Sequence, residues 1–421
     1  MRAYIEGINH RGEGVARIDG KVVFIPFAIP GELLEVEITE KKKTFSRGKI
    51  VRIIEPSIDR VQAPCPYYYD CGGCSYQHLN YARELELKQQ IVKDCVERIG
   101  KLQVPVLPVI GMGNPWRYRN KVEWHLAVNK DKPVMGYYCR EEREILEIDS
   151  CLLISEEMER LSNELQGKIS QYIKAGVHRI TVRQSSIDNT MGLIFHGSSP
   201  QGIKLDKLLK DNPLISSAFF AGRNKMQHLF GEPYIKEKIG NITYQLSPLA
   251  FFQINHLQSE KLFGLVKDYA NHLQGGEKIL DAYCGTGSIA LFMAENAGKV
   301  LGVESFAFAV DDARINARIN GIENCEFKTG KCEEITPRLD ENFNLVILDP
   351  PRAGCKKELI NALIAMSPEK IIYVSCNPAT MARDLALLKE GNYNIEKIQP
   401  VDMFPRTGHV ETVVLITRVK E

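Results

Sequence analysis

Ile371-Ile372-Tyr373-Val374-Ser375-Cys376-Asn377-Pro378 is a short apolar run, rich in β-branched residues, that ends in a turn signal. Such a run predicts a buried strand, which the Asn-Pro pair terminates. We therefore expect Cys376 at the carboxyl end of this strand, the edge where ligands and reacting groups collect in open α/β sheets. Taken alone, the stretch is equally compatible with a buried thiol that only packs as a small hydrophobe.

Strands and helices alternate on both sides of this stretch, from Lys278 to the last residues. This order predicts a Rossmann-like α/β domain. Its first strand runs into Cys284-Gly285-Thr286-Gly287-Ser288, a glycine turn that lets a ligand approach the backbone. The next strand ends at Glu304, near the interval at which ribose hydroxyls are bound. Together these features indicate an S-adenosylmethionine site, with another nucleotide-like ligand as the alternative.

Two further acids are expected at the same edge. A strand ending at Leu348 leads into Asp349-Pro350-Pro351-Arg352, whose prolines stiffen the loop that holds the aspartate. Enzymes that methylate exocyclic amines often have an aromatic residue where this chain has Arg352, so the motif argues against amino-group methylation. Glu411 opens the last apolar strand, where an acid is either catalytic or a simple edge charge.

A donor site, a thiol and a carboxylate together solve one chemical problem. The C5 atom of a pyrimidine is a weak nucleophile, but addition of a thiolate at C6 makes C5 enolate-like, so Cys376 is the predicted nucleophile. After methyl transfer the C5 proton must leave before the thiolate can be eliminated, and Glu411 is the predicted general base. Asp349 is predicted to hydrogen-bond the uracil ring edge, which would discriminate against cytosine.

The first 56 residues alternate short strand-like runs with glycine turns, which predicts a small β-barrel. Cations follow on an expected hairpin and strand, at Lys41, Lys42, Lys43, Arg47 and Lys49. A run of charges is usually a solvated face. The elements Gly12-Glu13-Gly14-Val15-Ala16 and Ile29-Pro30-Gly31-Glu32 resemble those of a TRAM domain, a small RNA-binding barrel.

Three cysteines, Cys65, Cys71 and Cys74, stand close together around two glycines. They supply three ligands for one metal centre, and Cys151 is the candidate fourth, with Cys95 and Cys139 as alternatives. Thiolate ligation favours zinc or an iron–sulfur cluster, and the spacing does not separate the two. Unrelated buried thiols are the remaining alternative. Cys95 falls in an amphipathic helical pattern, so we expect it in the core.

Strand-like segments dominate from about residue 104 to residue 250 and predict a central sheet-rich α+β domain. The run Trp116-Arg117-Tyr118-Arg119-Asn120-Lys121 interleaves aromatics with cations. That pattern suits stacking on RNA bases with phosphate neutralisation, but it equally suits a turn whose aromatics belong to the core. His125, His178 and His196 lie in strand-like runs, where most single histidines are structural.

Composition places limits on the class of protein. The 421 residues are enough for two or three domains, and a net charge of +1 with 44% hydrophobic residues is ordinary for a soluble protein. The sequence shows no long apolar run and no signal-peptide pattern, so we expect a cytoplasmic protein without a membrane partner, acting as a monomer. In that compartment the 11 cysteines do not predict a disulfide framework.

Taken together, the motifs closely resemble the RNA uridine-C5 methyltransferase family over essentially the whole chain. They are the barrel, the cysteines, Phe252-Gln253-Ile254-Asn255, Asp281 to Gly287, Asp349-Pro350-Pro351-Arg352, Ser375-Cys376-Asn377-Pro378 and Phe404-Pro405-x-Thr407-x-His409-x-Glu411. The resemblance implies a class I methyltransferase fold, Cys376 as nucleophile, Glu411 as proton acceptor and RNA as partner. It further implies two cofactors, namely S-adenosyl-L-methionine, held by Gln253, Tyr283, Gly285, Ser288, Glu304 and Asp349, and a [4Fe-4S] cluster, held by Cys65, Cys71, Cys74 and Cys151.

Three positions depart from the family pattern. Tyr283 replaces a phenylalanine and Ser288 replaces a common asparagine, and both changes are mild. Lys331 falls where relatives often have asparagine, so no donor contact is carried over to it.

The predicted domains are a TRAM-like barrel at 1–57, a central domain with the cysteines and an RNA-binding surface at 58–250, and the methyltransferase domain at 251–421. The barrel and the cysteines favour the 23S rRNA branch over tRNA as substrate. Amino-group methylation of an RNA base, or an RNA-binding protein without activity, are the alternatives. A methylthiotransferase is set aside, because its radical motif is C-x3-C-x2-C and this chain has C-x5-C-x2-C.

Overall fold

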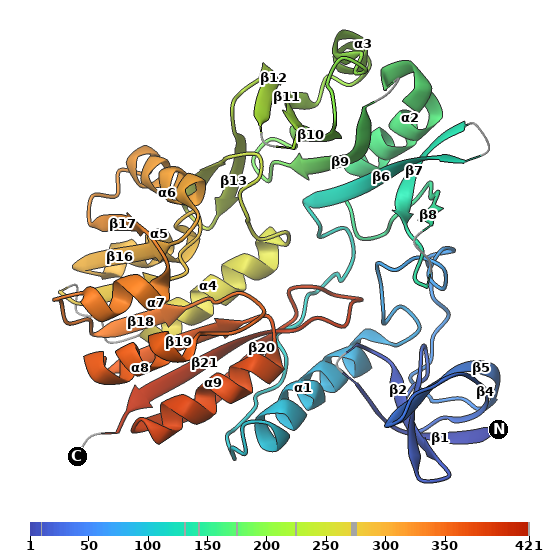
Figure 1. The fold of residues 1–421 in the computed structure, drawn as a ribbon, viewed down its shortest axis with the longest axis horizontal. Coiled ribbons are helices and arrows are strands. Elements are labelled where there is room, and N and C mark those ends of the chain that lie inside the picture. The colour runs from blue at the N-terminus through green and yellow to red at the C-terminus, as the bar shows by residue number, and fades with distance from the viewer. Residues whose placement is uncertain are drawn as a thin grey trace.

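The computed structural model describes residues 1–9, 11–129, 132–141, 144–173, 176–223, 225–270 and 276–419. These residues form a closed barrel, a seven-stranded central sheet, a short hairpin and a second seven-stranded sheet (Figure 1). The predicted fold class, a Rossmann-like domain with an N-terminal barrel and a sheet-rich middle, is confirmed. Among the described helices, none combines the length and the apolar character that crossing a membrane requires.

The N-terminal barrel closes because its strands bury every second side chain around a small core that includes Ile5, Ile25 and Leu34. A Cβ atom at Gly14 would lie 2.7 Å from the Cβ of Ala28, so only glycine fits this position of the predicted motif. The strands are β1 (Arg2–Ile8), β2 (Gly14–Ile18), β3 (Lys21–Ile25), β4 (Leu33–Lys41) and β5 (Phe45–Glu55).

The central sheet has the order β12-β11-β10-β9-β6-β7-β8, and its apolar side chains pack with those of α2 and α3 in one core cluster. His196 on this sheet contacts Thr181 Oγ1 at 2.9 Å and Arg179 at 3.0 Å, in line with a structural histidine. The elements are β6 (Lys121–Asn129), β7 (Lys132–Tyr138), β8 (Ile145–Leu146), α2 (Glu156–Tyr172), β9 (Val177–Gln184), β10 (Met191–Gly197), α3 (Leu205–Asp211), β11 (Ile215–Ala221) and β12 (Met226–Gly231).

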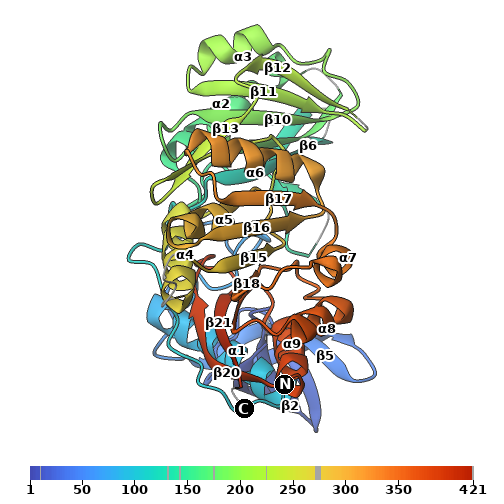
Figure 2. The same ribbon diagram turned by 90° about the vertical axis from the view of Figure 1, so that its left-hand side faces the viewer.

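The C-terminal sheet has the order β17-β16-β15-β18-β19-β21-β20, and of these strands β21 alone runs in the reverse direction, antiparallel to both β19 and β20. Figure 2 shows β17, β16, β15 and β18 one below another, with α4 on one side and α7 and α8 on the other. The strands are β15 (Lys278–Ala282), β16 (Lys299–Glu304), β17 (Cys325–Thr329), β18 (Leu345–Leu348), β19 (Lys370–Ser375), β20 (Tyr393–Val401) and β21 (Glu411–Arg418).

Helices cover both faces of this sheet because its strands are apolar on both sides. Ile279 of β15 belongs to the core cluster of α4, α5 and α6, whereas the next residue, Leu280, belongs to that of α8 and α9. The helices are α4 (His256–Ala270), α5 (Ser288–Met293), α6 (Ala307–Ile319), α7 (Cys332–Ile335), α8 (Lys357–Met366) and α9 (Pro378–Glu390).

Two elements from the predicted central segment pack on the C-terminal sheet. Helix α1 (Tyr81–Arg98) starts at Asn80, whose side chain accepts a hydrogen bond from Arg83 N, and it packs against α9 and β20. The hairpin of β13 (Ile235–Ile239) and β14 (Ile242–Leu246) buries Tyr244 and Leu246 in the core of α4, α5 and α6. The domain boundaries at residues 57 and 250 stay a prediction.

Candidate active site and cysteine cluster

The polar residues predicted for catalysis follow the carboxyl ends of neighbouring strands. β15, β18 and β19 are parallel and in register, with Ala282 opposite Leu348 and Leu348 opposite Tyr373. Tyr283, Asp349 and Cys376 therefore emerge at one edge of the sheet. Antiparallel β21 brings Glu411 to the same edge from the other direction, because Thr412 pairs with Ser375. The register thus places Glu411 and Cys376 at neighbouring positions just beyond the paired residues.

A pocket lies at this edge, and it contains five of the six residues predicted to hold the methyl donor. Its lining consists of Phe251, Phe252, Gln253, Asp281, Tyr283, Cys284, Gly285, Thr286, Ser288, Ile289 and Asp349. Glu304, the sixth, is next to this lining, because its Oε2 accepts a hydrogen bond from Gly285 N at 3.3 Å. Its Oε1 accepts another from Phe306 N at 2.8 Å, so both oxygens are oriented by the backbone.

The backbone of the glycine turn explains its sequence. Tyr283, Gly285 and Gly287 all have positive φ angles, of 68°, 55° and 78°. This left-handed path suits glycine, and it is unusual for the tyrosine, whose N–H donates to Cys332 Sγ at 3.2 Å. A Cβ atom at Gly287 would lie 3.1 Å from both Ala313 and Phe327, so glycine also permits the turn to pack on α6 and β17.

Six residues of this pocket were not predicted as site residues, among them Asp281 and Phe251. Asp281 is buried and neither of its carboxylate oxygens has a hydrogen-bond partner in the described residues. Burial and the neighbouring Asp349 raise the pKa of Asp281 well above its usual value. Phe251 is 75% exposed although it lines the pocket. The Asp-x-x-x-Gly-x-Gly pattern could have indicated Asp281, whereas the exposure of Phe251 has no signal in sequence.

The main electrostatic feature of the catalytic edge is that its acids are buried with few cations beside them. Burial raises the pKa of Asp349 to about 7. Burial, together with Asp349, raises the pKa of Glu411 to about 8, and Arg352 opposes the rise. Burial and these two acids raise the pKa of Cys376 to about 11. At neutral pH the thiol and most of the Glu411 carboxyl therefore hold protons, and a substrate that changes the local charge would favour their release.

The loops that carry Cys376 and Arg352 are tied together. Asn377 caps the following helix with its side-chain oxygen, which accepts from Ala379 N at 3.2 Å, and its Nδ2 donates to Arg352 O at 2.9 Å. Thr380 Oγ1 donates to the same carbonyl at 3.2 Å. Asn377 thus has a second role besides ending the strand, because it holds the Asp349–Arg352 loop beside the Cys376 thiol.

The four predicted ligand cysteines lie around a second cavity. Cys65, Cys71, Cys74 and Cys151 all line a cavity of about 140 Å³. The alternative ligands, Cys95 and Cys139, do not line it, because Cys95 is on α1 and Cys139 is joined to Cys71 through the backbone. In the part of the chain that the structure describes, no group of three His, Cys, Asp or Glu side chains is placed to hold a single metal ion.

The surroundings of this cavity fit a bound group that carries negative charge. Arg119 lines the cavity, is largely buried, and its Nε has no hydrogen-bond partner in the described residues. Arg140 donates from one nitrogen to the carbonyls of Tyr68, Cys71 and Cys74, which fixes the loop of the cysteines. Burial and the neighbouring thiols raise the pKa of Cys74 to about 12, so thiolates here require a compensating cation or metal centre.

The stretch Trp116 to Lys121 folds inward. This agrees with the interpretation of the stretch as a turn whose aromatic side chains belong to the core. Tyr118 is buried and donates to Pro405 O at 3.0 Å. Arg117 pairs with Glu159 at 2.7 Å, and Trp116 is covered by the guanidinium of Arg406, 4.7 Å from its ring centre. These side chains therefore join parts of the protein, and the alternative of an exposed base-stacking surface is not favoured.

Comparisons with known proteins agree with this geometry. The family model described as tRNA (uracil-5-)-methyltransferase matches residues 80–419, and the TRAM domain model matches residues 1–51. An RNA methyltransferase of Clostridium acetobutylicum named as uncharacterized is 39% identical over 447 residues, covering 99% of this chain and 96% of the relative. Another of the same description, from Clostridium tetani, is 38% identical over 439 residues, with 98% and 95% covered.

A solved structure is similar over the full length. It is that of the Pyrococcus abyssi tRNA (uracil-54, C5)-methyltransferase in complex with S-adenosyl-L-homocysteine. Its TM-score to this chain is 0.79 at 28% identity, and 99% of this chain and 100% of that chain are covered.

Proposed function

The chain belongs to the tRNA (uracil-5-)-methyltransferase family, and on this basis we propose that it transfers the methyl group of S-adenosylmethionine to C5 of a uridine in RNA. The observation that carries the proposal is the meeting of Cys376, Glu411 and Asp349 beside the pocket of the glycine turn. A protein that only bound RNA would have no chemical need for a thiol and two unpaired acids at this edge.

Each side chain has one task in the proposed reaction. The Cys376 thiol loses its proton to solvent and adds to C6 as a thiolate, and the electron pair of the C5–C6 double bond forms an enolate. C5 then attacks the methyl carbon, whose bond to the sulfonium sulfur breaks so that S-adenosylhomocysteine leaves. Glu411 then takes the C5 proton, the double bond re-forms, and the Cys376 sulfur leaves as a thiolate. Asp349 orients the uracil edge. A positively charged sulfonium next to Asp349 would favour the ionised forms of both acids.

The proposal also concerns which RNA is methylated. The barrel together with the four cysteines supports 23S rRNA. The likeness to the Pyrococcus abyssi enzyme, whose name gives tRNA as its substrate, supports tRNA as the second candidate. In either RNA we expect an unstacked or flipped uridine, because C6 is out of reach inside a stacked helix. Both RNAs fit the proposed cytoplasmic location, and we expect the enzyme to act as a monomer.

We propose that the four cysteines hold a [4Fe-4S] cluster in preference to a single zinc ion. Four thiols around one cavity with a buried arginine suit a large anionic group. Its proposed role is structural. The cluster would join the loop of Cys65 to Cys74 to the segment that carries Cys151 and keep both in place.

The cluster is tested with Cys65→Ala, using Cys139→Ala as the matched control. Cys65→Ala should lose bound iron and the visible absorption of the cluster, together with stability or RNA affinity. Cys139→Ala should retain all of them. If Cys65→Ala folded and bound RNA normally but lost turnover alone, the structural role would be wrong.

The reaction is tested with 23S rRNA and tRNA that contain 5-fluorouridine, incubated with S-adenosylmethionine and separated on a denaturing gel. Fluorine cannot leave as a cation, so thiolate addition should stop at a covalent protein–RNA adduct in the true substrate. The adduct should vanish in Cys376→Ala and persist in Cys95→Ala. Methyl transfer to ordinary RNA without any adduct would instead indicate amino-group methylation.

A further inference from the structure

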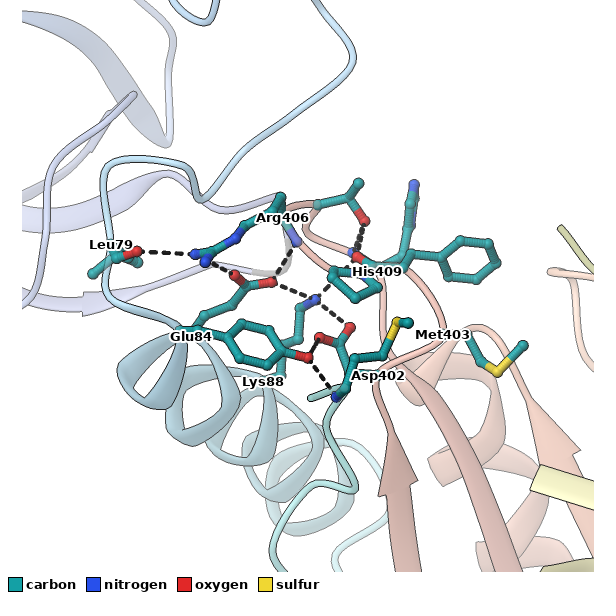
Figure 3. A network of polar contacts seen from close by, with 12 residues as sticks. Leu79, Glu84, Lys88, Asp402, Met403, Arg406 and His409 are labelled. Carbon is teal, nitrogen blue, oxygen red and sulfur yellow. Dashed lines mark hydrogen bonds and ion pairs between the residues drawn. The ribbon is translucent and has the colours of Figure 1, made fainter. Parts of the chain in front are cut away.

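Two acids and two cations form a buried cluster between helix α1 and the loop at 402–410 (Figure 3). Lys88 Nζ on α1 lies 2.8 Å from Glu84 Oε1 and 2.6 Å from Asp402 Oδ1. The backbone N–H of Arg406 donates to Glu84 Oε1 at 2.7 Å, and its guanidinium lies 3.4 Å from Glu84 Oε2. Lys88, Glu84 and Asp402 are 0% exposed. The four side chains are neutral as a set, so the cluster tolerates its burial.

This cluster is one of several contacts that hold the loop at 402–410 in place. The loop connects β20 to β21 and ends directly before Glu411. Its carbonyls accept hydrogen bonds from groups far away in sequence. The pairs are Lys88 Nζ to Phe404 O, Tyr118 Oη to Pro405 O, Ser75 N and Tyr76 N to Arg406 O, Asn255 Nδ2 to Met403 O and Gln258 Nε2 to Asp402 O.

Arg406 of this loop is fixed through both its backbone and its side chain. It has a φ of 67°, a left-handed conformation that is unusual for a residue with a side chain. Its guanidinium lies between the rings of Tyr81 and Trp116, at 5.0 Å and 4.7 Å from their centres, and donates to Leu79 O at 3.1 Å. Contacts on every side thus stabilise a backbone turn that the loop would not adopt alone.

The loop links the cluster to the catalytic edge through Phe404 and His409, whose rings lie 5.9 Å apart. Thr407 Oγ1 donates to Phe404 O at 2.8 Å and accepts from His409 N at 3.3 Å, which makes this end of the loop compact. Burial lowers the pKa of His409 to about 4, with Arg352 of the site and Lys88 of the cluster both contributing. His409 therefore lies between the two groups of charges.

We propose that Glu84 and Lys88 are positioning residues, which set the place of the Glu411 carboxylate through the loop at 402–410. The inference rests on the proposed function, in which Glu411 removes the C5 proton. Helix α1 thereby serves the second half of the reaction, and addition of Cys376 to C6 does not depend on it. A base displaced by about 1 Å can lose about 100-fold in rate, so a small shift of the loop would be measurable.

The test measures the covalent adduct on ordinary RNA under single-turnover conditions. The main variant is Lys88→Met/Asp402→Asn, which removes one cation and one anion and leaves the neutral pair of Glu84 and Arg406. We expect the adduct to form at close to the wild-type rate and to decay about 10- to 100-fold more slowly, so that it accumulates on a denaturing gel. Tyr81→Phe, which removes the 2.7 Å bond to Asp402 Oδ2 and the 2.9 Å bond that the hydroxyl accepts from Met112 N, should give a smaller accumulation.

Glu32→Gln is the matched control. It breaks another buried ion pair, in which Arg60 lies 2.6 Å from Glu32, a residue of the N-terminal barrel segment. It should lower stability without lengthening the life of the adduct. If both test variants gave adducts as short-lived as the wild type, with only a lower melting temperature, the positioning role would be overturned. Absence of any Cys376-dependent adduct in the wild type with 5-fluorouridine RNA would refute the proposed function itself.

Discussion

The structure contains two groups of buried acids, one between α1 and the loop at 402–410 and the other at the catalytic edge. They differ in whether cations lie beside them. Glu84 and Asp402 face Lys88 and Arg406 at hydrogen-bond distances. Asp349 raises the pKa values of both Asp281 and Glu411, and Arg352 is the cation that opposes the rise at Glu411. The acids of the first group have cations as direct partners, whereas burial and neighbouring acids raise the pKa values of the second group. Compensated acids here hold structure, and uncompensated ones are available for chemistry.

The pKa shifts follow this difference. Burial alone would lower the pKa of Lys88, but Asp402 and Glu84 outweigh it and raise the value. Burial raises the pKa of Glu84, and Lys88 opposes that rise. For Asp349, burial raises the pKa to about 7 with no cation to oppose it. The fold therefore carries a destabilising set of acids at the catalytic edge, which is expected where function requires it.

Removing the base should have the largest effect on turnover. Glu411→Gln should lower the methylation rate by about 100- to 10,000-fold, because it removes the carboxylate proposed to take the C5 proton. It should not lower the melting temperature above about pH 8, since it removes a buried charge that lacks a partner. Turnover assays and thermal denaturation measure the two effects. Glu396→Gln, an exposed acid on β20, is the control and should change neither.

Removing the cation that Glu84 and Asp402 share should mainly lower the stability of the fold. Lys88→Met leaves two buried carboxylates without their shared cation, so the free energy of unfolding should fall by about 3–5 kcal/mol. Denaturant titration measures this change. Lys93→Met, on the same helix but with its side chain 54% exposed, should change it by less than about 0.5 kcal/mol. An equal loss in both variants would contradict the difference between the two groups.

Activity should depend on pH through the uncompensated acids. Glu411 must be ionised to accept a proton, so kcat/KM should fall by up to about tenfold per unit as pH drops below about 8. Stability should change in the opposite sense. An acid whose pKa is raised by folding stabilises the protein while protonated, so this contribution is lost as pH rises through about 7 for Asp349 and about 8 for Glu411. A flat profile in both measurements would refute the assignment.

The cation of the catalytic edge should have the smallest effect. Arg352 opposes the raised pKa values of Cys376 and Glu411, so Arg352→Gln should move the activity profile to higher pH. The loss at neutral pH should be less than about tenfold, the change that one pKa unit produces. A pH–rate profile separates this shift from a uniform loss. Arg418→Gln, at the exposed end of β21, should leave the profile in place.

Much of the candidate site could be predicted because its residues sit at the ends of strands with clear local patterns. The apolar runs before Asp349 and Cys376 predict buried parallel strands, and parallel strands bring their carboxyl ends to one edge. The glycine turn at Gly285 and Gly287 was predictable for the same reason, since only glycine suits those turns. Short-range pattern and stereochemistry were sufficient at these positions.

What the sequence determined by itself was therefore the order of strands and helices, the barrel, and which residues stand at strand ends. The tertiary structure alone decided which distant partners meet. It placed Cys151, and not Cys95 or Cys139, at the cavity of the other three cysteines, turned Trp116 and Tyr118 inward, and placed α1 against the loop before Glu411. The physical reason is that local periodicity encodes which side of an element is buried, whereas the pairing of Lys88 with Asp402, 314 positions apart, depends on how the completed elements pack.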